Sequence, residues 1–142
     1  ADALYCDRET LYLVEFKNGS LKETLGKRLN PKDDEELGIN LGQRDALIEK
    51  CKDSVLICSD LWGKRTRWFR EHCVFVLVYN EDKNKTALKR VASSIRRKAR
   101  FGLPDKLKGF CVKDVLTLTE KEFSTSLLST WRDAEEIAEV DA

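Results

Sequence analysis

The 142 residues are enough for one domain with a hydrophobic core and too few for us to expect two. A composition of 42% hydrophobic and 36% charged residues excludes a disordered or fibrous chain, and the net charge of +1 does not by itself indicate a partner. No apolar stretch reaches the roughly 18 residues of a membrane span, so the sequence predicts a single domain over residues 1–142 with no membrane partner.

The cysteines indicate a reducing compartment. They number five, lack any CxxC pair, and four of them have apolar neighbours; they stand at positions 6, 51, 58, 73 and 111. Such cysteines are typical of reduced core residues. The N-terminus shows no secretory pattern, so we expect a cytoplasmic protein.

The first 17 residues predict a β-hairpin. Two β-rich runs, 3–6 and 11–17, flank the polar segment 7–10. If the turn is centred on Arg8 and Glu9, residues whose numbers sum to 17 face each other across the ladder. The charged segment 20–42 has little apolar periodicity and is predicted to be a long loop.

Helical and strand patterns alternate after the loop. Apolar residues recur at helical spacing from about Gln43 to Trp62, and Gly63 follows as a helix stop. The unbroken apolar run 73–79 predicts a central strand that is buried on both faces. A second helix is expected over 86–100.

The C-terminal part predicts a further strand and helix. Gly102 and Pro104 are expected to close the preceding helix, and a strand is expected over 112–118. The Thr-x-x-Glu spacing of residues 119–122 is typical of a helix start. The last helix would turn three residues inward: Phe123, Leu127 and Trp131. The order of elements predicts an α/β fold, a mixed central sheet flanked by helices.

Two acids and a lysine are expected to meet on one face of the hairpin. The register places Asp2 opposite Glu15, with Cβ atoms about 5 Å apart. Lys17 follows Glu15 by two residues, so its amine lies on the same face. Carboxylate oxygens bind Mg²⁺ or Mn²⁺, and such an ion polarises a phosphate and activates water. This set of side chains is what hydrolysis of a phosphodiester requires.

The run from Leu11 to Gly19, with Asp2 on the preceding strand, resembles the PD-(D/E)xK nuclease superfamily, which has the restriction-endonuclease-like fold. The resemblance implies that Asp2 and Glu15 are metal ligands, that the Phe16 carbonyl adds a third oxygen, and that Lys17 is the catalytic lysine. It covers roughly residues 1–100. Ala1 stands where the family often has proline, and the first helix and strand of the family core should precede Asp2, so we expect upstream core elements to be missing.

The E-x-K motif alone has low specificity. Residues 81–83 are a second example, but they lie in a polar turn and lack a facing acid. The structural alternative for the first copy is that Glu15 and Lys17 form the solvated face of an edge strand, with Asp2 at a frayed terminus.

Basic side chains offer weaker signals for nucleic-acid binding. Lys50 lies on the helix after the E-x-K strand, where the resemblance implies a polar residue near the metal site, and a second helix carries Lys89, Arg96 and Arg100. A phosphate backbone could bind these groups, although a solvated face is the favoured interpretation.

The sequence therefore predicts a Mg²⁺-dependent or Mn²⁺-dependent endonuclease or exonuclease acting on DNA, with RNA the less favoured substrate and a homodimer left open. One alternative is a catalytically silent domain of the same fold that binds a protein or nucleic acid, as some toxin-immunity proteins do. Another is an unrelated α/β interaction domain in which the hairpin acids are incidental.

The basic helix can be tested by salt dependence. Changing Arg96 and Arg100 together to Ala should make the negative slope of log affinity against log salt shallower by about 2, if each binds one phosphate of duplex DNA. The slope comes from fluorescence anisotropy with a labelled duplex at several salt concentrations. An unchanged slope would remove this helix from the interface.

Overall fold

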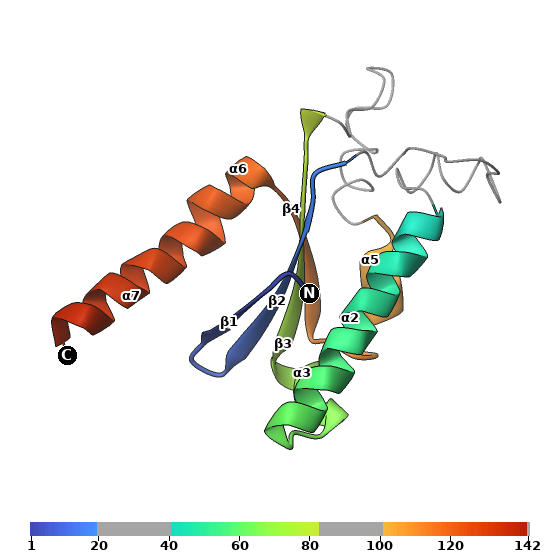
Figure 1. Cartoon of the computed structure of the whole chain (residues 1–142), viewed down its shortest axis with the longest axis horizontal. Helices are drawn as coiled ribbons and strands as arrows, with labels where there is room; N and C mark the ends of the chain where they lie inside the picture. The colour runs from blue at the N-terminus through green and yellow to red at the C-terminus, as the bar shows by residue number, and fades with distance from the viewer. Residues whose placement is uncertain (20–40, 83–100, 142) are drawn as a thin grey trace.

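The computed structural model describes residues 1–19, 41–82 and 101–141, and within them a four-stranded mixed sheet. The strands are β1 (Ala3–Asp7), β2 (Thr10–Lys17), β3 (Cys73–Tyr79) and β4 (Asp114–Thr119), in the order β1-β2-β3-β4. β1 runs antiparallel to β2, whereas β2, β3 and β4 are parallel. Helices lie on both sides of the sheet (Figure 1). The predicted α/β class with a mixed, helix-flanked sheet is confirmed.

The hairpin has the predicted register. Its pairs run from Ala3 opposite Val14 to Asp7 opposite Thr10, so the numbers of facing residues sum to 17. The turn is Arg8 and Glu9, and Arg8 has a φ of 55°, in the left-handed region. Because β2 pairs with β3 on its other side, β2 is an interior strand. The alternative of an edge strand with a solvated face is therefore wrong.

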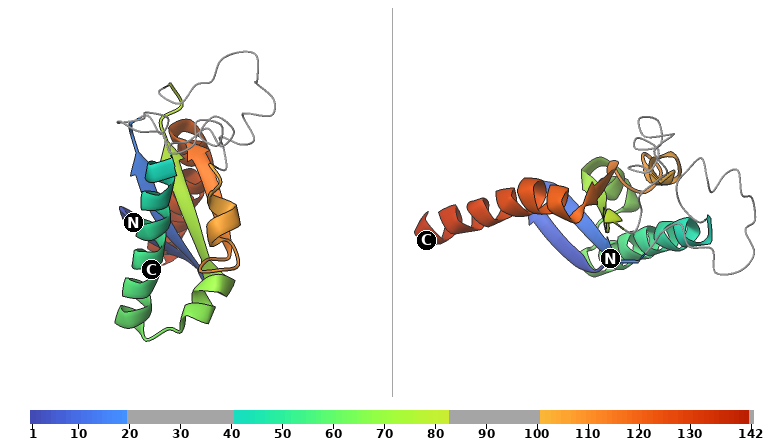
Figure 2. Two further views of the ribbon diagram at one scale, coloured as in Figure 1. Left: turned by 90° about the vertical axis from the view of Figure 1, so that its right-hand side faces the viewer. Right: turned by 90° about the horizontal axis from the view of Figure 1, so that it is seen from above.

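One face of the sheet packs against α2 (Leu41–Trp62), α3 (Thr66–His72) and α5 (Leu103–Leu107). Leu11 and Leu13 of β2 contribute to this core with the buried stripe of α2: Leu47, Cys51, Val55 and Cys58. Figure 2 shows α2 running along the sheet beside the hairpin. Since β2 and β3 are parallel, the chain must cross over between them, and α2 lies in that crossover.

The opposite face packs against a continuous helical segment made of α6 (Glu120–Phe123), a π-helical stretch η3 (Ser124–Leu128) and α7 (Ser129–Asp141). Its first turn has the predicted capping box: Glu122 N–H donates to Thr119 Oγ1 at 3.2 Å, and Thr119 N–H donates to Glu122 Oε1 at 2.9 Å. Phe123 and Trp131 are buried and Leu127 is half-buried, as predicted.

Several predicted boundaries need correction. Helix α2 begins at Leu41, so residues 41 and 42 do not belong to the predicted loop, and β4 spans Asp114–Thr119 instead of 112–118. Pro104 lies in the first turn of α5, a position that suits proline because it has no amide hydrogen to lose there. Helix α3 was not predicted. The rest of the predicted loop, residues 20–40, and the predicted helix 86–100 lie outside the described residues.

The cysteines are free, as predicted: Cys6 is exposed and the other four are buried. Burial raises the pKa of the Cys73 thiol to about 12, which keeps it protonated at neutral pH. Within the described ranges no helix is long and apolar enough to cross a membrane.

The turn gives a test of the hairpin. A left-handed conformation costs a non-glycine residue about 1 to 2 kcal/mol, so Arg8→Gly should leave the free energy of unfolding unchanged or raise it by up to about 1 kcal/mol despite the added chain entropy of glycine. Glu9→Gly lacks this relief and should lower it by about 0.5 to 1 kcal/mol. Urea unfolding of both variants measures the difference, and equal losses would contradict the described turn.

Candidate active site at the end of the hairpin

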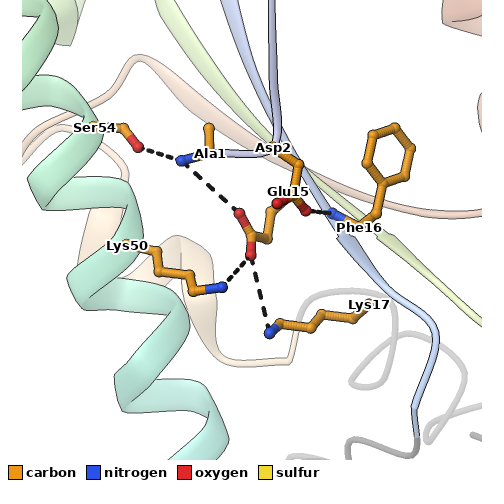
Figure 3. A network of polar contacts seen from close by, with 7 residues as sticks. All are labelled: Ala1, Asp2, Glu15, Phe16, Lys17, Lys50 and Ser54. Atoms are coloured by element: carbon orange, nitrogen blue, oxygen red, sulfur yellow. Dashed lines mark hydrogen bonds and ion pairs between the residues drawn. The ribbon is translucent and has the colours of Figure 1, made fainter.

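Glu15 is a carboxylate buried between the sheet and helix α2. Alternation along β2 places it on the face of Leu11 and Leu13, the face that α2 covers, and its side chain is only 1% exposed. Lys17 lies on the same face, with its Nζ 3.9 Å from Glu15 Oε1 (Figure 3). The predicted proximity of Glu15 and Lys17 is thus present.

Helix α2 supplies a second lysine to this carboxylate. Lys50 Nζ donates a hydrogen bond to Glu15 Oε1 at 2.6 Å, as Figure 3 shows. Four residues further along the helix, Ser54 Oγ accepts a hydrogen bond of 2.6 Å from the Ala1 amine, which lies 3.9 Å from Glu15 Oε2. Glu15 is therefore surrounded by cationic groups from the hairpin and from α2.

The sequence offered Lys50 as a weak nucleic-acid contact and as a polar residue near the metal site, but its direct pairing with Glu15 was not predicted. A signal for it exists in the helical pattern. Lys50 follows the buried Leu47 by three residues, and Ser54 follows the buried Cys51 by three. Both polar side chains consequently lie beside the stripe that packs on the sheet.

Asp2 lies at the start of the hairpin, immediately before β1. Its N–H donates to the Val14 carbonyl at 2.9 Å, and its Oδ2 accepts a hydrogen bond of 2.8 Å from the Phe16 amide. The predicted register thus brings Asp2 to the end of β2, with its carboxylate held on the backbone between Glu15 and Lys17.

The two carboxylates and the two lysines form one electrostatic unit. The pKa of Lys17 is lowered from its ordinary 10.5, mainly by burial and to a smaller extent by the neighbouring Lys50. The negative charges of Glu15 and Asp2 oppose this effect. The hydrogen bond to Glu15 is the largest of the effects that raise the pKa of Lys50. Asp2 also raises the pKa of Lys50, so both acids act on both ammonium groups.

Oxygen donors suited to a hard cation are present at this point. Asp2 and Glu15 supply carboxylates, and the Phe16 carbonyl faces the same strand edge as its amide, on the side of Asp2. Mg²⁺ commonly uses one or two carboxylates and keeps several waters, so this donor set fits Mg²⁺ or Mn²⁺. Nowhere in residues 1–19, 41–82 or 101–141 do three or more His, Cys, Asp or Glu side chains gather as a metal site.

The other predicted residues divide into two groups. Lys89, Arg96 and Arg100 lie outside the described part of the chain. The Phe16 ring belongs to the opposite face of the sheet, edge-on to Phe123 with centroids 5.7 Å apart, so only its backbone faces the site.

The unequal effects on the two lysines can be measured. On raising the pH, Lys17 should lose its proton before Lys50, because the folded protein lowers the pKa of the first and raises that of the second. Glu15→Gln should lower both pKa values, since it removes a negative charge that favours each ammonium. NMR titration of ¹³C-methylated lysines reads each residue. Lys17 titrating at or above Lys50 would contradict the described arrangement.

Comparisons of the chain with models of protein families, with curated proteins and with solved structures find no match. Two carboxylates, two lysines and a backbone carbonyl meet at the end of β2, where the sheet and α2 enclose one of the acids.

Proposed function

We propose that this chain is a metal-dependent nuclease domain of the PD-(D/E)xK type, which hydrolyses phosphodiester bonds of DNA. The observation that supports it most is the hairpin register, because it brings Asp2 to the E-x-K segment while Glu15 and Lys17 share one face. The order of hairpin, helix α2 and strand β3 agrees with the order expected for a restriction-endonuclease-like core.

In this proposal Asp2, Glu15 and the Phe16 carbonyl would hold Mg²⁺ or Mn²⁺. The ion, when bound, would polarise the scissile phosphate and lower the pKa of a water molecule. The protein fixes the donors beforehand: Glu15 is held in a buried position on an interior strand, and Asp2 is held by the Phe16 amide. Fixed donors reduce the reorganisation that binding would otherwise cost.

Lys17 is the proposed catalytic lysine. It extends from the same strand as Glu15, and its Nζ lies 3.9 Å from that carboxylate. Burial and the nearby Lys50 lower its pKa, which brings the amine closer to accepting a proton from the attacking water at neutral pH. As an ammonium it would instead orient that water and stabilise charge that develops on the phosphate.

The second candidate is a catalytically silent domain of the same fold that binds a protein or nucleic acid. The observation that favours it is the compensation of Glu15 by positive groups of the protein itself, with Lys50 at 2.6 Å. A buried carboxylate that is paired and hydrogen-bonded is stable without any metal. Cleavage activity separates the two candidates.

The test is cleavage of plasmid and oligonucleotide DNA with Mg²⁺ or Mn²⁺. The unaltered protein should cut, and EDTA should abolish cutting. Lys17→Ala should reduce the rate by about 100-fold or more, the scale of a lost proton-transfer group. Glu15→Gln should remove cleavage because it removes a charged ligand without changing the shape of the side chain.

Lys113→Ala is the matched control. Lys113 is exposed and precedes β4 at the end of the sheet opposite to Lys17, so its loss should leave the rate unchanged. Circular dichroism verifies the folding of each variant. DNA binding without cleavage under any metal condition, unaffected by the two site variants, would favour the silent domain.

A further inference from the structure

The ammonium of Lys50 occupies the place beside the Glu15 carboxylate that a bound metal ion would need. Its Nζ lies 2.6 Å from Glu15 Oε1, the oxygen that Lys17 approaches at 3.9 Å (Figure 3). The Glu15 carboxylate has almost no contact with solvent. An incoming cation therefore has to replace one of the groups that now surround the carboxylate.

Of the two lysines, Lys50 is the one with room to move. The Lys50 side chain is 46% exposed and extends from α2, which packs on the sheet. The Lys17 side chain is 35% exposed and extends from the same strand as Glu15. The four methylene groups of a lysine rotate freely enough to swing an ammonium into water without a change in the backbone. The backbone of Lys17 stays two residues from Glu15 on the same face of the strand, which keeps its ammonium within reach of the site.

The charges of the site prevent the Lys50 ammonium and a divalent cation from binding the Glu15 carboxylate at the same time. The two carboxylates, Asp2 and Glu15, are already matched by Lys17 and Lys50, and the Ala1 amine lies a further 3.9 Å from Glu15 Oε2. A divalent ion on Glu15 adds two positive charges beside the ammonium of Lys50. Like charges in contact at a buried carboxylate repel each other strongly, because the surroundings screen them poorly.

We propose that Lys50 is an exchangeable counter-ion: it neutralises Glu15 in the metal-free protein and leaves the carboxylate when a divalent cation binds. This inference rests on the proposed function, since it concerns the same metal site. It assigns Lys50 a role distinct from that of Lys17, which stays at the site in both states. Lys50 also keeps the buried acid from standing uncompensated before metal arrives.

The experiment measures Mn²⁺ affinity by isothermal titration calorimetry on the full chain. Lys50→Gln should bind Mn²⁺ about tenfold more tightly than the unaltered protein, the scale of a charge-assisted hydrogen bond that no longer competes. Lys50→Arg, which keeps the positive charge, should remain close to the unaltered protein. Lys52→Gln is the matched control: it removes the same charge from the same helix, but Lys52 lies over the Phe110 ring, so its affinity should stay within about twofold.

A second measurement needs no variant that might unfold. In the unaltered chain with ¹³C-methylated lysines, Mg²⁺ should shift the NMR signal of Lys50 and leave that of Lys52 in place. Equal Mn²⁺ affinities for the unaltered protein and Lys50→Gln, weaker binding by Lys50→Gln, or an unmoved Lys50 signal in the Mg²⁺-bound protein would each overturn the exchange and leave the nuclease proposal standing. No Mn²⁺ binding by any variant would overturn both.

Discussion

A buried carboxylate must be matched by positive charge, and in this protein that requirement applies to Glu15. Its side chain is 1% exposed at the junction of β2 with α2, where an unpaired charge would be strongly destabilising. Lys50 and Lys17 meet the requirement in the described structure. In the proposed function the same requirement would favour a metal cation at this site, because a buried carboxylate is stabilised by any positive group that pairs with it.

The fold explains why such a carboxylate exists. The parallel pairing of β2 with β3 forces a crossover, and α2 in that crossover covers the face on which Leu11, Leu13 and Glu15 follow one another. The antiparallel β1 adds Asp2 at the point where the Glu15 side chain leaves the sheet. Sheet register and helix placement together determine the geometry of the site: Glu15 and Lys17 come from β2, Asp2 precedes β1, and Lys50 comes from α2.

Local patterns were sufficient to predict the hairpin register, the buried central strand, the long helix with its stop at Gly63 and the capping box at Thr119. Each depends on neighbours in sequence: a two-residue turn, an apolar run, a left-handed glycine, a Thr-x-x-Glu spacing. The pairing of Lys50 with Glu15 could not be predicted in this way. The two residues are 35 positions apart in sequence, and their contact depends on how α2 lies across β2. The short helices α3 and α5 were missed because seven-residue and five-residue segments show too little periodicity.

If Asp2 and Glu15 form a cation site, Lys50 withdraws from Glu15 when the cation binds. Diffraction from a crystal soaked in Mn²⁺, recorded at a wavelength where manganese scatters anomalously, would locate both the ion and the Lys50 ammonium. We expect an anomalous peak between the two carboxylates, with the Phe16 carbonyl as a neighbour and the Lys50 ammonium displaced from Glu15. A map with no peak there and with Lys50 still bonded to Glu15 at saturating Mn²⁺ would contradict it.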